Sequence, residues 1–532
     1  MPRVILDWDQ KYKRAIIASD FLDSIRAQFS IPNESKVMMK RQGRPTWHMA
    51  DFISPISNTG RFDLGLYFEI IKLLKAESNI DYEIITTEPL QKQLIQTYRW
   101  NDKYEIAKLN IPLRPYQESG VKRGIHMGYG VLIVGTAGGK TLLMASLIET
   151  IRSNEMPFTT LVILPSNLVK QTHKDYLEYG IRESDISIWG GDDEFTKKPI
   201  IIASAEILRS NLTTFAERKP KTFFKYKYEN QAATEEDYRR YIEEYADKEK
   251  NRKKEWLKRR KDILNQLYDV ELMLIDEVHG LRKGNVINDV VTMFPTQHRF
   301  GFTGTLPEDL TDQWNITGII GPTIMDIDSA ALREMGYIAQ VKTQIIKLHY
   351  KNPPRTKIDI FVPTKAYDAE CEFLYHNEFR NKVISHLAAN FDKNCLIMVD
   401  SIDHGETLEK ILKEKTQKNV YFIRGSVETE DREKLRALME IDNNIVCVAM
   451  SRIFAVGVNI KNLHYVIFAQ GGKAKVTLIQ SIGRGLRLHD QKECLVIIDI
   501  ADATHYGLQH LEDRMSYYKD EQIEYETKEL CE

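Results

Sequence analysis

A turn of small residues followed by a lysine and a threonine is the part of this sequence best suited to chemistry. The turn follows the apolar run 131–134 and consists of Gly135, Thr136, Ala137, Gly138, Gly139, Lys140 and Thr141. Backbone N–H groups of such a turn can bind phosphates, while the lysine reaches the terminal phosphates and the threonine hydroxyl holds Mg²⁺. We therefore predict a site for a nucleoside triphosphate. Because Val134 stands where the full pattern has glycine, a flexible connection with a solvated lysine remains the alternative.

Two adjacent carboxylates follow a second apolar run. Asp276 and Glu277 come directly after residues 272–275, whose side chains predict a buried strand. Ligands of an open parallel sheet lie at the carboxyl ends of its strands. We therefore expect Asp276 to hold Mg²⁺, through water, and Glu277 to orient and deprotonate the attacking water. The hydroxyls of residues 303–305 follow another strand and suit the sensing of the terminal phosphate.

Two more groups suit the same site, although each alone could be a surface turn or a helix charge. Arg114 and Gln117 are candidate contacts to the nucleotide, because the Gln117 amide both donates and accepts hydrogen bonds, which matches the edge of adenine. In the run 480–487, Arg484 and Arg487 are three residues apart and would share one face of a helix. Arginines delivered across a cleft can neutralise the charge of a phosphoryl-transfer transition state.

Composition excludes several classes of protein. The chain has 532 residues, 42% of them apolar, and no apolar run long enough to span a membrane. Five scattered cysteines without a CxxC pair argue against a disulfide scaffold or a zinc site. A charged N-terminus is unlike a signal peptide, so we expect a cytoplasmic protein (in the host cytoplasm if phage-encoded). Separately, we expect a monomer. With a net charge of −2, a nucleic-acid partner would have to be held by local patches.

The order of the expected elements predicts an α/β protein with two tandem lobes, each built on a parallel sheet. Residues 1–105 form a small α/β domain, 106–340 the first lobe, 341–505 the second lobe and 506–532 a polar helical tail. Residues 213–266 are rich in charge and predict a helical hairpin inserted into the first lobe.

Two basic segments are candidate contacts for a nucleic acid. Residues 40–48 include Arg41, Gly43, Arg44 and an aromatic side chain, and could grip a phosphate backbone. Residues 251–262 carry seven cations against two anions. In both cases the alternative is a solvated surface.

Taken in chain order, Gln117, residues 139–141, 276–279, 303–305 and 480–487 resemble the motifs of the superfamily 2 helicases and translocases. The resemblance spans about residues 106–500. It implies two RecA-like lobes with ATP and Mg²⁺ between them and a nucleic-acid strand across both. It also implies roles for single residues. Contacts to the nucleic-acid backbone would come from Pro165, Ser166, Asn167, Ser204 and Ser401. Gly457 would lie in the motif that links the nucleotide site to the nucleic acid. Gln480, Arg484 and Arg487 would act on ATP.

The N-terminal domain and the segment 457–466 also resemble those of phage recombination helicases. This closer likeness implies a DNA helicase that remodels branched DNA by migrating junctions, regressing forks and unwinding R-loops. The insertion 213–266 has no counterpart in that pattern. Two alternatives stay open: an RNA helicase, and a double-strand DNA translocase that does not separate strands.

Overall fold

The computed structural model describes residues 2–76, 82–95, 104–154, 159–190, 195–230, 234–294, 296, 298–354, 363–424, 429–451, 460, 462–469 and 494–532. The chain divides into two compact units. The first contains residues 1–133 and 140–326, and the second contains residues 134–139 and 327–532. All five cysteines are free. None of the helices in these ranges combines the length and the hydropathy that crossing a bilayer requires.

The N-terminal domain is a four-stranded sheet in the order β5-β2-β1-β6. Strand β1 (Arg3–Asp9) pairs antiparallel with β2 (Arg14–Ala18) and parallel with β6 (Glu83–Thr86), while β5 (Arg61–Phe62) forms one edge. Alternate residues of the strands are buried against three helices, because side chains alternate between the faces of a strand. These helices are α1 (Leu22–Gln28), α3 (Tyr67–Ala76) and α4 (Glu88–Ile95).

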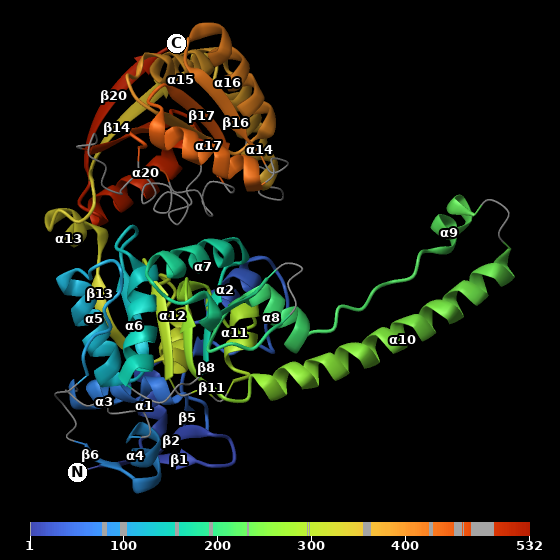
Figure 1. Ribbon diagram of the computed structural model, residues 1–532, viewed down its shortest axis with the longest axis vertical. Helices are drawn as coiled ribbons and strands as arrows, with labels where there is room; N and C mark the ends of the chain where they lie inside the picture. Colours follow the sequence, from blue (N-terminus) through green and yellow to red (C-terminus); the bar gives the residue numbers. More distant parts are fainter. Residues whose placement is uncertain are drawn as a thin grey trace. The chain divides into compact units, whose positions relative to one another are not determined.

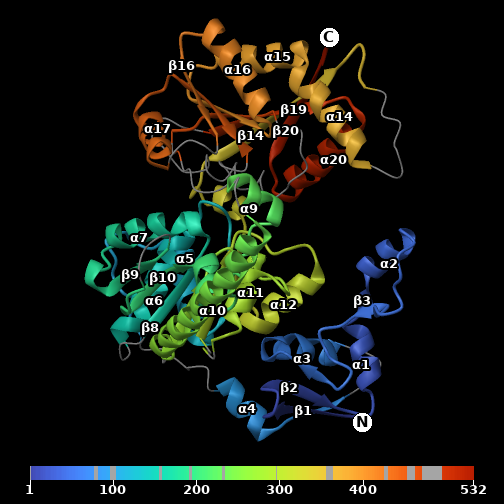
Figure 2. The ribbon, with the colours of Figure 1, turned by 90° about the vertical axis from the view of Figure 1, so that its right-hand side faces the viewer.

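A small subdomain extends from this core in Figure 2. It consists of α2 (Glu34–Arg41) and the two-stranded sheet of β3 (Ile31–Pro32) and β4 (Phe52–Ile53). Asn33 caps α2 by accepting the backbone N–H of Lys36 at 3.1 Å. No residue of α2 is buried, and only Lys36 and Met39 are half-buried, so most of the helix surface is exposed.

The first lobe is a seven-stranded sheet, and the pairings from β7 to β9 are parallel. The strand order is β13 (Thr323–Ile327), β7 (Gly130–Val134), β12 (His298–Thr303), β11 (Val270–Ile275), β8 (Thr159–Leu164), β10 (Ile200–Ser204) and β9 (Ile186–Trp189). One face is covered by α8 (Ala205–Leu212), α11 (Val286–Val291), α12 (Leu310–Ile320) and the end of α10 (Glu235–Gln266). The other face packs against α5 (Pro115–Met127) and α6 (Lys140–Asn154).

The predicted insertion is an arm that projects from the first lobe (Figure 1). Helix α10 has 32 residues and spans about 48 Å at 1.5 Å per residue. Its C-terminal end is anchored by Ile263, which is buried in the core of the lobe. At the far end, Tyr226 of α9 (Phe223–Glu229) stacks on Tyr241 with ring centroids 4.7 Å apart. The insertion is therefore helical, but the expected hairpin is wrong in detail, since only one of its arms is a long helix.

The second unit contains another seven-stranded parallel sheet. Its order is β16 (Asn419–Ile423), β17 (Ile445–Met450), β15 (Cys395–Val399), β18 (Tyr465–Phe468), β19 (Cys494–Asp502), β14 (Gln340–His349) and β20 (Glu524–Cys531). Helices α14 (Pro363–His376), α15 (Glu378–Asn390) and α16 (Ile402–Lys415) share a core with this sheet. The two parallel sheets confirm the predicted fold class of tandem RecA-like lobes.

The C-terminal segment differs from the prediction, because a strand follows the expected helix. Residues 506–532 were expected to form a helical tail, and α20 (His505–Asp520) is that helix. The chain then continues into β20, which pairs with β14 at the edge of the second sheet. Most of β20 is exposed and polar, so its sequence lacks the apolar alternation that indicates a strand.

Candidate nucleotide site and nucleic-acid contacts

The predicted phosphate-binding turn lies between a strand and a helix, as that motif requires. Strand β7 ends at Val134 and α6 begins at Lys140. Inside the turn, the N–H of Gly138 donates to the carbonyl oxygen of Gly135 at 2.9 Å. Ala137 and Gly139 have φ values of +64° and +79°. Two left-handed residues in so short a turn curl its backbone, which can gather N–H groups around an anion.

Two glycines of the turn have no room for a side chain. A Cβ atom on Gly135 would lie 2.7 Å from the backbone nitrogen of Ser329. One on Gly138 would lie 2.9 Å from the carbonyl oxygen of Gly135 and 2.8 Å from Cδ1 of Leu332. Helix α13 (Ser329–Glu334) therefore packs directly on the turn and limits its shape.

The charge of Lys140 acts on Asp276 within the first unit. Asp276 directly follows β11, and its N–H donates to the carbonyl oxygen of Ile163 at 3.0 Å. Burial and, to a smaller extent, the charge of Glu277 raise the pKa of Asp276 to about 6, although the Lys140 ammonium acts to lower it. The structure thus brings together the lysine and the carboxylate that were 136 positions apart in the sequence. A buried carboxylate whose charge is disfavoured is suited to a cation.

The second carboxylate is held by a histidine that sequence analysis had not assigned a role. Oε2 of Glu277 lies 3.2 Å from Nδ1 of His279, and the same nitrogen lies 3.1 Å from Oγ1 of Thr303. The Thr303 hydroxyl donates to the carbonyl oxygen of Thr305 at 2.8 Å. Glu277 itself has a φ of +50°, a conformation uncommon for a residue with a side chain. Glu277 is therefore coupled to the end of β12, where the predicted hydroxyls lie.

Gln117 has a structural role at the start of α5. The side chain is buried in the first turn of α5, and its Oε1 accepts the backbone N–H of Arg114 at 2.9 Å. The acceptor half of the amide therefore stabilises the start of the helix. Recognition of adenine by Gln117 and Arg114 stays a prediction.

Two of the three predicted serine contacts, Ser204 and Ser401, are helix caps. Oγ of Ser204 accepts the N–H of Ile207 at 3.2 Å at the start of α8, and Oγ of Ser401 accepts that of His404 at 3.4 Å at the start of α16. Each hydroxyl keeps its own O–H for donation. Pro165, Ser166 and Asn167 lie at the end of β8, where Ser166 and Asn167 are exposed. Contact of these groups with nucleic acid stays a prediction.

The basic segment 40–48 lies at the exposed end of α2. Arg41 and Arg44 are exposed, and Trp47 is 88% exposed. Four other predicted site residues, Gly457, Gln480, Arg484 and Arg487, lie outside the described residues.

Comparison with known proteins finds two matching families. The family described as the res subunit of type III restriction enzymes matches residues 110–308, and the helicase conserved C-terminal domain matches residues 378–489. A curated relative, the ATP-dependent DNA helicase uvsW of Enterobacteria phage T4, is 25% identical over 477 residues. The alignment covers 84% of this chain and 83% of that protein.

Two solved structures are also similar. The crystal structure of T4 UvsW aligns with a TM-score of 0.41 and 21% identity and covers 99% of both chains. The ATP-dependent type ISP restriction-modification enzyme LlaBIII, bound to DNA, aligns with a TM-score of 0.52 and 11% identity. That alignment covers 86% of this chain and 34% of the enzyme, and it supports the fold alone.

Proposed function

We propose that this chain, which belongs to the superfamily 2 helicases and is an ATP-hydrolysing enzyme, uses ATP to remodel branched DNA. The observation that carries this proposal is the cluster at the carboxyl ends of β11 and β12. There Asp276 is under the influence of Lys140, and Glu277 is linked to Thr303 through His279. The alignment with uvsW over most of both chains supports DNA as the substrate. We also propose that the N-terminal domain ends near residue 105 and that the first lobe ends near residue 340.

The residues present fit a nucleotide with Mg²⁺. The turn 135–139 offers backbone donors and lacks room for side chains, and Asp276 is a buried carboxylate that a cation would stabilise. Thr141 and Asp276 would hold Mg²⁺, which neutralises charge on the phosphates when it is bound. Lys140 would bind the terminal phosphates.

The side chains around Glu277 fit the activation of water. A general base must be held at a defined angle, and His279 supplies that restraint at 3.2 Å from the Glu277 carboxylate. Because the same histidine nitrogen contacts Thr303, a change at the end of β12 would reach Glu277 directly. We propose that Arg484 and Arg487 complete the site from the second lobe, and that each cycle of ATP binding and hydrolysis moves the lobes along one DNA strand.

Two surfaces of the first unit are suited to duplex DNA. One is the exposed end of α2 with Arg41, Arg44 and Trp47. The other is the arm, where residues 213–266 carry sixteen cations and eleven anions although the whole chain has a net charge of −2. On α10 a stripe of exposed lysines has no ion pair among the described residues: Lys250, Lys254, Lys258 and Lys261. Spacings of three and four residues align them on one helix face, which a phosphate backbone could follow.

The proposal is tested by ATP turnover on different nucleic acids. We expect four-way and forked DNA to stimulate turnover more than linear duplex, single-stranded DNA or structured RNA. Strongest stimulation by structured RNA would favour an RNA helicase. Equal stimulation by linear and branched duplex, with displacement of a triplex but no strand separation, would favour a double-strand translocase.

A variant tests the assignment of the ATP site itself. Lys140→Ala should lower turnover by about 10²–10³-fold, because one charged donor to the transferred phosphoryl group is removed. DNA binding should persist. The exposed Lys122 on α5 provides a matched control, and Lys122→Ala should retain wild-type turnover. Undiminished hydrolysis by Lys140→Ala would refute the site.

A further inference from the structure

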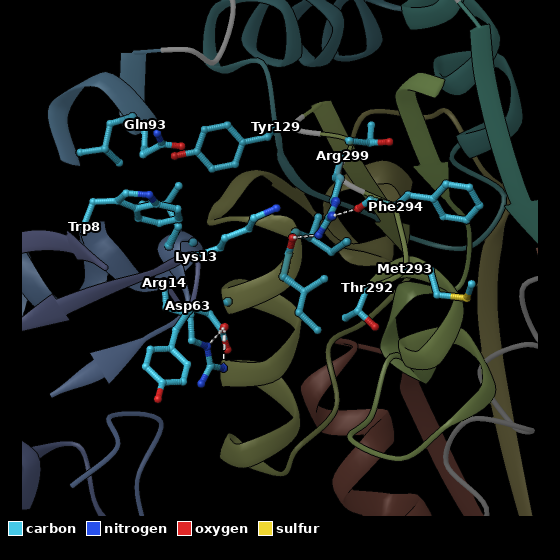
Figure 3. Close-up of a pocket in the computed structure, with 18 of the residues that line it drawn as sticks. Trp8, Lys13, Arg14, Asp63, Gln93, Tyr129, Thr292, Met293, Phe294 and Arg299 are labelled. Carbon is cyan, nitrogen blue, oxygen red and sulfur yellow. Dashed lines mark hydrogen bonds and ion pairs between the residues drawn. The ribbon is translucent and has the colours of Figure 1, made fainter. Parts of the chain in front are cut away.

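A second cavity lies between the N-terminal domain and the first lobe, within the first unit (Figure 3). Its volume is about 800 Å³. The first lobe contributes Tyr129, just before β7, four residues that precede β12 (Thr292, Met293, Phe294 and Thr296), and Arg299 within β12. These loops join the amino ends of the parallel strands, whereas Asp276 and Thr303 lie at the carboxyl ends. The cavity is therefore separate from the predicted ATP site.

One wall contains a cation, Arg299, that forms no ion pair with a carboxylate of the described residues. Arg299 donates from Nη2 to the carbonyl oxygen of Phe294 at 2.6 Å and from Nη1 to that of Ile319 at 3.3 Å. Its Nε is buried and has no hydrogen-bond partner in the described part of the chain. Burial lowers the pKa of Arg299 to about 10, because it removes the guanidinium charge from water. A bound anion would offset that cost.

The opposite wall supplies a second cation. Lys13 lies in the turn between β1 and β2, and Figure 3 shows its side chain extending toward the side of the cavity where Arg299 lies. No carboxylate of the described residues lies within ion-pair distance of its amine. Lys13 has a φ of +50°, a conformation that normally favours glycine, so a lysine here is held at a cost in backbone energy.

The balance of charge and the apolar surfaces restrict the ligand class. The lining contains three cations, Lys13, Arg14 and Arg299, and one anion, Asp63, which pairs with Arg14 at 2.6 Å. The cavity thus has a net charge of +2. Trp8 and Tyr129 add flat aromatic surfaces (Figure 3). Cations beside aromatic rings suit a phosphate joined to a base.

We propose that this cavity is a second nucleotide-binding site, in which Lys13 and Arg299 hold a phosphate and Trp8 and Tyr129 contact the base. The nucleotide is either free or part of a DNA strand, since both carry the same chemistry. The N-terminal domain and the first lobe would both contact it, so its binding would couple the two.

Lys13 is the position to test, because Arg299 also holds the carbonyl oxygens of Phe294 and Ile319, and its replacement could unfold the lobe. Lys13→Glu changes an exposed turn residue and reverses the charge that faces the cavity. Lys11 is the matched control. It lies in the same turn, is exposed and does not line the cavity. Thermal unfolding of both variants should match the wild type to within a few degrees.

A free nucleotide is tested by equilibrium dialysis with radiolabelled ADP on the full chain. We expect two equivalents to bind to the wild type and to Lys11→Glu, and one equivalent to Lys13→Glu at the same concentration, owing to a loss of at least about tenfold in affinity at the second site.

A DNA strand is tested by photocrosslinking of a single-stranded oligonucleotide that contains 5-iodouracil. We expect crosslinks at Trp8 or Tyr129 in the wild type and Lys11→Glu, and at least about tenfold fewer in Lys13→Glu. One equivalent of ADP in all three proteins, together with no crosslink at these residues, would overturn the proposal. So would binding that Lys13→Glu and Lys11→Glu change equally. Neither readout requires ATP hydrolysis, so the result is independent of the proposed motor function.

Discussion

At the scale of single residues, Asp276 shows how a residue proposed to hold Mg²⁺ can cost stability. Its pKa is 3.8 in an unfolded chain, and burial raises it to about 6 in the folded protein. Between these values the folded state binds more protons than the unfolded state, so unfolding becomes easier as pH rises. The stabilising contribution is complete below pH 3.8 and is lost as the pH passes through about 6. Two pKa units correspond to about 3 kcal/mol.

This leads to a pH-dependent prediction for Asp276→Asn. An amide cannot ionise, yet its oxygen can still accept the N–H of Glu277 that Asp276 accepts at 2.9 Å. With EDTA and without nucleotide, the melting temperature of the variant should be close to that of the wild type at pH 4 and higher at pH 8. Its ATP turnover should be lost. A difference in melting temperature that stays constant from pH 4 to pH 8 would show that the ionisation of Asp276 is not its cause.

At the scale of elements, the proposed phosphate-binding turn depends on helix α13, which packs against it. Gly135→Ala would bring a methyl group to 2.7 Å from the Ser329 nitrogen, closer than any real contact, so the turn must move. We expect a loss of about tenfold or more in affinity for ATP, because displaced N–H groups no longer point at the phosphates. Gly190→Ala is the control, since a Cβ there meets only an ordinary contact of 3.5 Å. Nucleotide titration of both variants measures the difference.

The arm makes a separate prediction at the same scale. Replacement of both Lys254 and Lys258 by Glu should weaken DNA binding and lower the salt dependence of binding by about one unit for each phosphate that the arm no longer neutralises. The same change in charge at Lys410 and Lys415 on α16, which are also exposed, controls for net charge. Binding isotherms at several salt concentrations give the slopes. Identical slopes for the arm variant and the wild type would show that Lys254 and Lys258 do not contact DNA phosphates.

At the scale of the whole molecule, the N-terminal domain is packed closely on the first lobe. A Cβ on Gly65 would lie 1.9 Å from the carbonyl oxygen of Thr317, and one on Gly318 would lie 2.9 Å from Cβ of Asp63. Trp314 of α12 packs against the core of the N-terminal domain. Removal of the domain would therefore expose apolar surface of the lobe, and substitutions on α2 test its role more cleanly.

We predict that combined Arg41→Glu, Arg44→Glu and Trp47→Ala lowers the preference for four-way over linear DNA by about tenfold or more. These side chains are exposed, so stability should change little. Basal ATP turnover should be retained because the nucleotide residues are untouched. The measurement compares dissociation constants for the two DNA forms. An unchanged ratio of the two dissociation constants would show that α2 does not select junctions, and the arm would then be the next surface to test.

Much of the architecture could be predicted because its signals are local. Runs such as 395–399 and 465–468 are apolar over the length of a strand, and they are the strands β15 and β18. Side-chain periodicity and burial are properties of neighbouring residues, so the sequence alone determined the two parallel sheets and the helical character of the insertion. The turn 135–141 and the carboxylates at 276 and 277 were found for the same reason.

Other features depended on interactions between distant parts of the chain. The pairing of β20 with β14, the link from Glu277 through His279 to Thr303, and the cavity shared by Lys13 and Arg299 leave no periodic trace in the sequence. The capping roles of Ser204 and Ser401 likewise became visible only with the helices in place. Only the tertiary structure decided these features, because each is an interaction across space between residues whose local sequences are compatible with many partners.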